Sequence, residues 1–85
     1  MIYATAGTLE SNDCMITVTQ HDQQEILIDS IVKEAFGDQI LAVILGVLNQ
    51  LKVKNIKVHI QDKGALDYTI RARLKTALKR LEDVK

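Results

Sequence analysis

The stretch "NIKVHIQD", residues 55–62, is the clearest indication of a β-strand in this chain. Its apolar and polar residues alternate one by one, which is typical of a strand with one buried and one solvated face. A second layer of structure must therefore cover one side of the sheet to which this strand belongs. The inward residues are Ile56, Val58 and Ile60, and the outward residues are Lys57, His59 and Gln61.

The residues before this strand predict a helix. Gly37 indicates a break, and Asp38 is a suitable N-cap from which a helix begins. Apolar residues then recur at helical spacing as far as Leu51, and Phe36 continues the same stripe backward. Residues 31–36 fit either the end of a strand or the first helical turns, and both alternatives stay open. The stripe consists of Ile40, Ile44, Val47, Leu48 and Leu51, and it is widened by Leu41 and Leu45.

The residues after the strand predict a second helix. Gly64 suits a turn with positive φ, and Asp67 places a negative charge in the first helical turn, where the helix dipole favours it. Together with Asp62, these residues are expected to shape the junction between strand and helix. The apolar side of the helix contains Leu66, Ile70, Leu74, Leu78 and Leu81, and its exposed side contains a basic stripe, Arg71, Lys75 and Lys79, with Arg73 and Arg80 nearby.

The N-terminal residues predict a β-hairpin. The segments Tyr3–Glu10 and Cys14–Gln20 are rich in Thr, Ile, Val and small residues. Asn12 and Asp13 tolerate the positive φ of a two-residue hairpin loop, which would place Ser11 beside the tip. One apolar face results if Ser11 faces Cys14, Leu9 faces Ile16 and Gly7 faces Val18.

The predicted fold class is α+β. A turn at His21–Gln24 leads to a third strand, Glu25–Ser30, with Ile26 and Ile28 inward. The resulting order, β-β-β-α-β-α, predicts a two-layer sandwich in which two helices cover one face of a mostly antiparallel sheet. A crossover through the first helix would make the fourth strand parallel to the third, if those strands are neighbours. A length of 85 residues predicts a single domain, residues 1–85.

Charge and composition indicate the compartment in which the protein acts and the kind of surface it presents. The net charge is zero, but residues 1–38 carry −6 and residues 39–85 carry +6, so the chain either presents opposite surfaces to a charged partner or interleaves them on folding. The longest apolar run, Ile40–Leu48, is too short to span a bilayer, and the N-terminus lacks a signal-peptide pattern. A lone cysteine, Cys14, excludes an internal disulfide. We therefore expect a cytoplasmic protein without a membrane segment.

Residues that perform catalysis are scarce. His21 and His59 are the only histidines, and neither lies near Ser11 or Cys14 in the sequence. No triad, metal-ligand spacing, Walker loop or GxGxxG is present, so we expect neither catalytic residues nor a metal site, and Cys14 is expected to be a small strand residue. Nucleic-acid binding is disfavoured because the chain is neutral and its few aromatics, Tyr3, Phe36 and Tyr68, do not form a stacking face.

Three segments resemble one family. They are "AGTLESND" at residues 6–13, "FGDQI" at residues 36–40 and "DKGALDYTIRAR" at residues 62–73, and together they resemble the citrate lyase acyl carrier protein (gamma chain) family. The resemblance covers nearly the whole chain. It implies that Ser11 carries phosphoribosyl-dephospho-coenzyme A through a phosphodiester. It also implies that the thiol of this arm holds acetyl and citryl groups as thioesters while citrate is cleaved to acetate and oxaloacetate.

The resemblance also implies which proteins this chain would bind, and it leaves alternative functions open. The partners would be the alpha and beta subunits of citrate lyase and the transferase that attaches the arm, and the chain itself would be a non-catalytic carrier. The acyl carrier subunit of malonate decarboxylase, which uses the same kind of arm, is the nearest alternative. A small nucleic-acid- or protein-binding α+β module is an alternative of another class. Glu10 and Asp13 either help the transferase to recognise the tip or keep it solvated, and the basic stripe either docks a larger subunit or is solvated.

Overall fold

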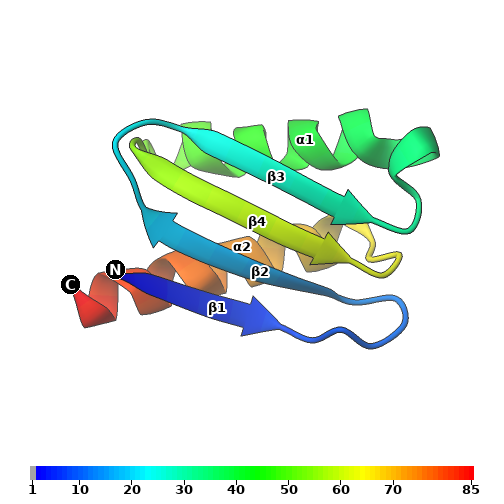
Figure 1. Ribbon diagram of the computed structural model, residues 1–85, viewed down its shortest axis with the longest axis horizontal. Helices are drawn as coiled ribbons and strands as arrows, with labels where there is room; N and C mark the ends of the chain where they lie inside the picture. Colours follow the sequence, from blue (N-terminus) through cyan, green and yellow to red (C-terminus); the bar gives the residue numbers. More distant parts are fainter. Residues whose placement is uncertain (1) are drawn as a thin grey trace.

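The computed structural model describes residues 2–85, and its elements follow the predicted order (Figure 1). Both helices lie behind one face of a four-stranded sheet, and the other face of the sheet is open. The α+β fold class is therefore confirmed. The elements are β1 (Tyr3–Gly7), β2 (Cys14–Gln20), β3 (Glu25–Ser30), α1 (Lys33–Gln50), β4 (Ile56–Asp62) and α2 (Asp67–Val84).

The sheet has the strand order β1-β2-β4-β3. Strand β2 is antiparallel to both β1 and β4, while β3 and β4 are parallel neighbours joined through α1. The mostly antiparallel sheet and the single parallel pair are thus as predicted. Within residues 2–85, neither helix is long and apolar enough to cross a membrane.

The core lies between the sheet and the two helices. The alternation of β4 is confirmed, because its apolar residues are buried and its outward residues are not. Ile26 and Ile28 of β3 pack against the same core from its edge. The buried apolar residues are Ala4, Ala6, Cys14, Ile16, Val18, Ile40, Ile44, Val47, Leu48, Ile56, Val58, Ile60, Ile70, Leu74, Ala77, Leu78 and Leu81.

The predicted helix start at Asp38 is wrong, whereas the alternative in which residues 31–36 contain the first helical turns is correct from Lys33 onward. Helix α1 begins at Lys33 and continues through Gly37 and Asp38 without a break. The reason is a contact that local sequence does not show: the Ser30 hydroxyl donates to a carboxylate oxygen of Asp62 at 2.7 Å and accepts the Val32 N–H at 3.1 Å. This arrangement turns the chain out of β3 and starts the helix early, and an interior glycine costs a helix only about 1 kcal/mol.

Three residues that were predicted on the apolar stripes are exposed. Phe36 and Leu51, at opposite ends of α1, are 51% and 45% exposed, and Leu66, just before α2, is 59% exposed. The predicted stripes are therefore too long.

The predicted register of the hairpin is also wrong. Gly7 pairs with Met15 and Ala6 pairs with Ile16, so the strands separate at Gly7 and a longer loop joins them. Leu9, predicted to face the core, is 48% exposed.

Candidate functional site

The loop that joins β1 to β2, residues 8–13, leaves the sheet at a glycine. Gly7 has φ +101°, and a Cβ atom at this position would overlap the carbonyl oxygen of Cys14. The Thr8 N–H donates to the same oxygen at 3.1 Å. This close approach of two backbone segments ends the strand pairing at Gly7, four residues before Ser11, where a two-residue turn would end it, and it produces the longer loop.

The side chain of Asp13 closes the loop. One carboxylate oxygen accepts a hydrogen bond from the Thr8 hydroxyl at 2.7 Å, and the other accepts the Cys14 N–H at 2.7 Å. The Asp13 N–H donates to the carbonyl oxygen of Glu10 at 3.2 Å. The two ends of the loop are thus held together by one aspartate, which is a common role for this residue in turns.

The loop is also bound to the turn between β4 and α2. The Asn12 N–H donates to the Lys63 carbonyl at 2.8 Å, and the Lys63 N–H donates to the Asp13 carbonyl at 2.9 Å. Arg73 of α2 forms a bidentate pair with the Asp13 carboxylate, at 3.0 Å from Nε and 2.8 Å from Nη2. Asn12 has φ 66°, as expected, but Asp13 does not have the positive φ that a two-residue loop would require of it. The loop is therefore a fixed part of the fold.

The hydrogen bonds from Arg73 and Thr8 and from the Cys14 N–H hold the pKa of Asp13 well below its ordinary value, at about 2. The Asp13 side chain is only 14% exposed, so water screens the pair incompletely. The negative charge of Asp13 is therefore part of the loop structure.

Replacing Arg73 with glutamine should raise the pKa of Asp13 from about 2 toward its ordinary 3.8, because the carboxylate loses the hydrogen bonds that lower its pKa most. The Asp13 carboxyl is more acidic in the folded protein than in the unfolded chain. Its pairing therefore stabilises the fold above about pH 4, and this contribution disappears as the pH falls toward 2. Carboxyl carbon shifts followed by NMR during an acid titration would measure the change. Arg71→Gln, on the exposed side of α2, is the control, and an unchanged Asp13 pKa in Arg73→Gln would contradict the pairing.

Ser11 lies at the outer part of this loop, where residues 9–12 are all exposed. Within residues 2–85, its hydroxyl forms no hydrogen bond. The loop is at the end of the molecule where α1 begins and β4 ends (Figure 1). A large enzyme can reach the oxygen of an exposed hydroxyl on a fixed loop, so the residues present fit the covalent attachment of a group to Ser11.

The structure does not bring the other candidate residues to Ser11. Cys14 is fully buried, and burial raises the pKa of its thiol to about 12, so it is the inert strand residue that was expected. His59 lies on the open face of the sheet opposite Thr17. His21 follows the far end of β2 and lies 3.6 Å from Glu25. Among residues 2–85 there is no group of three or more side chains that could hold a metal ion.

Sequence reasoning missed the role of Arg73. It was placed near the basic stripe, but its position three residues after buried Ile70 and four before buried Ala77 puts it at the edge of the apolar face. Arg80 also links α2 to another part of the fold, because it donates to the Thr5 carbonyl of the edge strand β1 at 2.8 Å. Asp13 and Arg73 come from the acidic and basic parts of the chain, so folding interleaves some of the opposite charges.

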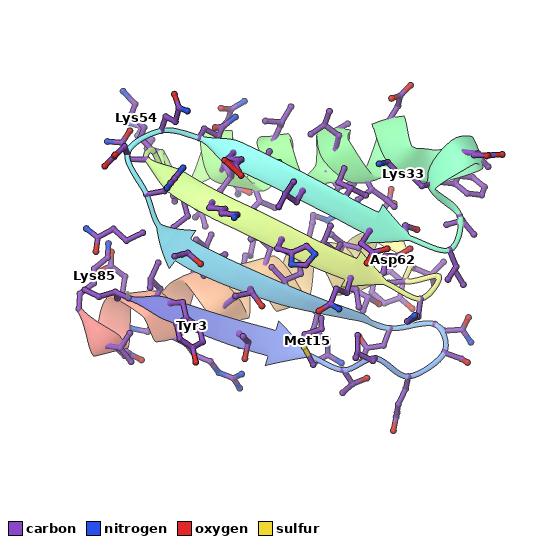
Figure 2. The ribbon with its side chains drawn as sticks, viewed as in Figure 1. Tyr3, Met15, Lys33, Lys54, Asp62 and Lys85 are labelled. Atoms are coloured by element: carbon purple, nitrogen blue, oxygen red, sulfur yellow. The ribbon has the colours of Figure 1, made fainter. Side chains whose placement is uncertain are left out.

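An apolar groove of about 470 Å³ lies beside the loop, between the start of α1 and the β4–α2 turn. Its apolar walls include Phe36, Leu66 and Tyr68. Figure 2 shows Asp62 at this end of the molecule, together with Lys33, whereas Lys54 and Lys85 lie at the opposite end. Asp62 supports the groove from below the surface, because its carboxylate accepts the N–H groups of two residues of the turn.

Comparison with known proteins identifies the class of this chain as an acyl carrier. The model of the acyl carrier family described as malonate decarboxylase delta subunit (MdcD) matches residues 2–81. The curated relatives are more specific, since they are citrate lyase acyl carrier proteins. The protein of Treponema denticola is 45% identical over 80 residues, which cover 94% of this chain and 92% of that protein. Those of Edwardsiella ictaluri and Haemophilus ducreyi are 45% and 46% identical, cover 95% and 94% of this chain, and are themselves covered over 85% and 84% of their lengths.

The chain belongs to the citrate lyase acyl carrier protein family, as the segments at residues 6–13, 36–40 and 62–73 indicated. A solved chain of a malonate decarboxylase hetero-tetramer from Pseudomonas, in complex with malonate, has the same fold. Its TM-score is 0.75 at 16% identity, over 93% of this chain and 82% of that one. This neighbour is one subunit of a multi-subunit complex.

Proposed function

We propose that this chain is the acyl carrier subunit of citrate lyase and that its coenzyme-A-derived arm is attached to Ser11. One observation carries the proposal: in a member of this family, Ser11 of the segment "GTLES" is exposed on a loop fixed to the fold by Asp13 and Arg73. Such a site offers a hydroxyl to a modifying enzyme and keeps the attachment point away from the core.

The proposed arm is phosphoribosyl-dephospho-coenzyme A, held by a phosphodiester to the Ser11 oxygen. When bound, it supplies a thiol that carries acyl groups as thioesters. The chain itself holds the attachment point of the arm in a fixed position. A tethered group meets neighbouring active sites at a high effective concentration, and a fixed attachment point keeps it among them.

The chemistry of attachment must come from the partner enzyme. A serine hydroxyl is a weak nucleophile unless a base removes its proton, and His21 and His59 both lie outside the loop. The proposed transferase therefore provides the base, and Ser11 provides only the oxygen that accepts the phosphoryl group. The proposed carrier is also non-catalytic toward the acyl group, because the alpha and beta subunits of citrate lyase would make and break its bonds.

A carrier subunit of malonate decarboxylase is the second candidate, favoured by the family model over residues 2–81 and by the structural neighbour. The citrate lyase carriers, at 45–46% identity over most of the chain, favour the first candidate more strongly. We propose the cytoplasm as the place of action, because the lone cysteine is a buried thiol of the kind found in a reducing compartment.

The intact mass of the protein purified from its native host tests the proposal. We expect a covalent adduct on the wild-type chain and none on Ser11→Ala, because no other exposed serine exists: the second serine, Ser30, donates to Asp62. Ser30→Ala is the matched control and should keep the adduct. An adduct on Ser11→Ala, or an unmodified wild-type chain from cells with active lyase, would refute the assignment.

A further inference from the structure

We propose that the apolar groove beside the loop binds part of the chain's own arm whenever that arm is outside a partner's active site. The inference rests on the proposed function, since it requires an arm on Ser11. The groove is bounded by Phe36, Leu66 and Tyr68, and its volume of about 470 Å³ is within the range of small-molecule sites.

The lining of the groove is unusually apolar for a free surface. Phe36, Leu66 and Tyr68 are 51%, 59% and 66% exposed, yet they gather around one hollow at one end of the molecule. Phe36 and Leu66 depart from the buried stripes that helical spacing predicts for them. Departures of this kind, where apolar residues stay exposed around a hollow, point to a ligand or partner.

The polar groups at the rim suit the same ligand. Gln39 of α1 donates to both carboxylate oxygens of Asp67 of α2 at 3.0 Å, so the two helices are linked across the groove. The arm combines alkyl segments with amide groups and a purine ring. Its alkyl and ring portions match the apolar and aromatic walls, and its amide N–H groups match the acceptor oxygens of the rim.

The attachment point lies next to the groove wall. Asn12, the neighbour of Ser11, is hydrogen-bonded to Lys63 at 2.8 Å, and its side-chain oxygen lies 3.7 Å from where a Cβ of Gly64 would be. Gly64 itself lines the groove. A short tether gives an effective concentration in the millimolar range, so at roughly 2 mM an intrinsic dissociation constant of about 1 mM would keep the groove about two-thirds occupied.

The reactivity of the arm's thiol tests this inference. The probe is an aromatic disulfide reagent added to the loaded protein from its native host, and intact mass first establishes that each sample carries the arm. We expect the thiol of Leu66→Gln and of Phe36→Gln to react about threefold faster than that of the wild type, because the free fraction of the arm rises. Leu51→Gln is the matched control, since Leu51 is a similarly exposed leucine at the far end of α1. Buried Cys14 gives the background, measured on Ser11→Ala.

A second readout compares loaded with unloaded protein. Amide NMR signals of the groove residues Ala65 and Tyr68 should differ between loaded and unloaded protein, and these differences should vanish in Leu66→Gln. Equal thiol reactivity in all loaded variants, with shifts confined to residues 8–13, would overturn the inference. So would groove variants that lose only binding to the larger subunits, since the groove would then be a protein-docking surface. A chain that carries no arm contradicts the proposed function instead, and mass distinguishes this failure from the others.

Discussion

Gly7→Ala is expected to lower the free energy of unfolding by about 3–5 kcal/mol, a loss large enough to unfold much of a small protein. Two effects add. The backbone of Gly7 has φ +101°, which an L-residue with a side chain rarely adopts. The added Cβ would also overlap the Cys14 carbonyl oxygen and approach the Met15 Cα to 3.2 Å, and both are backbone atoms that cannot move alone.

The matched control is Gly46→Ala. Gly46 lies in α1, and a Cβ there meets no atom within 4 Å. The same chemical change should therefore stabilise the protein by about 0.5–1 kcal/mol, through helix propensity and a less flexible unfolded chain. Urea unfolding followed by circular dichroism measures both variants. Two variants of equal stability would mean that the strands can separate at Gly7 without this close approach.

Asp62→Ala should cost about 2–4 kcal/mol in the free energy of unfolding, because it leaves three half-buried donors without a partner. Asp62 is 2% exposed, and its carboxylate accepts the Ser30 hydroxyl at 2.7 Å, the Ala65 N–H at 2.9 Å and the Gly64 N–H at 3.2 Å. All three donors lose their acceptor at once. The loss should be local as well as global, since the start of α1 and the β4–α2 turn share this side chain.

Asp29→Ala is the control for Asp62, because Asp29 is an exposed aspartate on the neighbouring strand β3. We expect a change of at most about 0.5 kcal/mol for a surface site of this kind. Hydrogen exchange would show the local effect, as faster exchange of the Ala65 and Val32 amides in Asp62→Ala. If both variants unfold at the same urea concentration, the carboxylate contributes no net stability.

The sequence predicted the parts of the fold that depend on local periodicity. Strand β4 follows from strict alternation, and the apolar side of α2 from its helical spacing. The hairpin register could not be found in this way. An apolar face that includes Leu9 satisfies the alternation equally well, and only the conformation of Gly7 and the hydrogen bonds of Asp13 exclude it.

The start of α1 and the bracing of the loop depend on contacts between distant residues. Ser30 and Asp62 are 32 positions apart, and Asp13 and Arg73 are 60 apart. Nothing within a helical window indicates these pairs, so Gly37 and Asp38 were the strongest local signals and gave the wrong boundary. Ser11 is a third case, because a serine in a turn is ordinary. The resemblance to a family singled it out, and the structure adds its exposure and the fixed loop beneath it.

The hydrogen bonds of Asn12 and Asp13 to the body of the protein limit how far an arm on Ser11 could carry an acyl group. If the arm is attached to Ser11 as proposed, it starts from a point that does not travel relative to α2, so its reach equals its own contour length. Two active centres served in turn must then lie inside one sphere centred on that serine, or the entire small subunit must shift between them. Measuring the separation of those centres in the assembled complex would decide which of these motions the cycle uses.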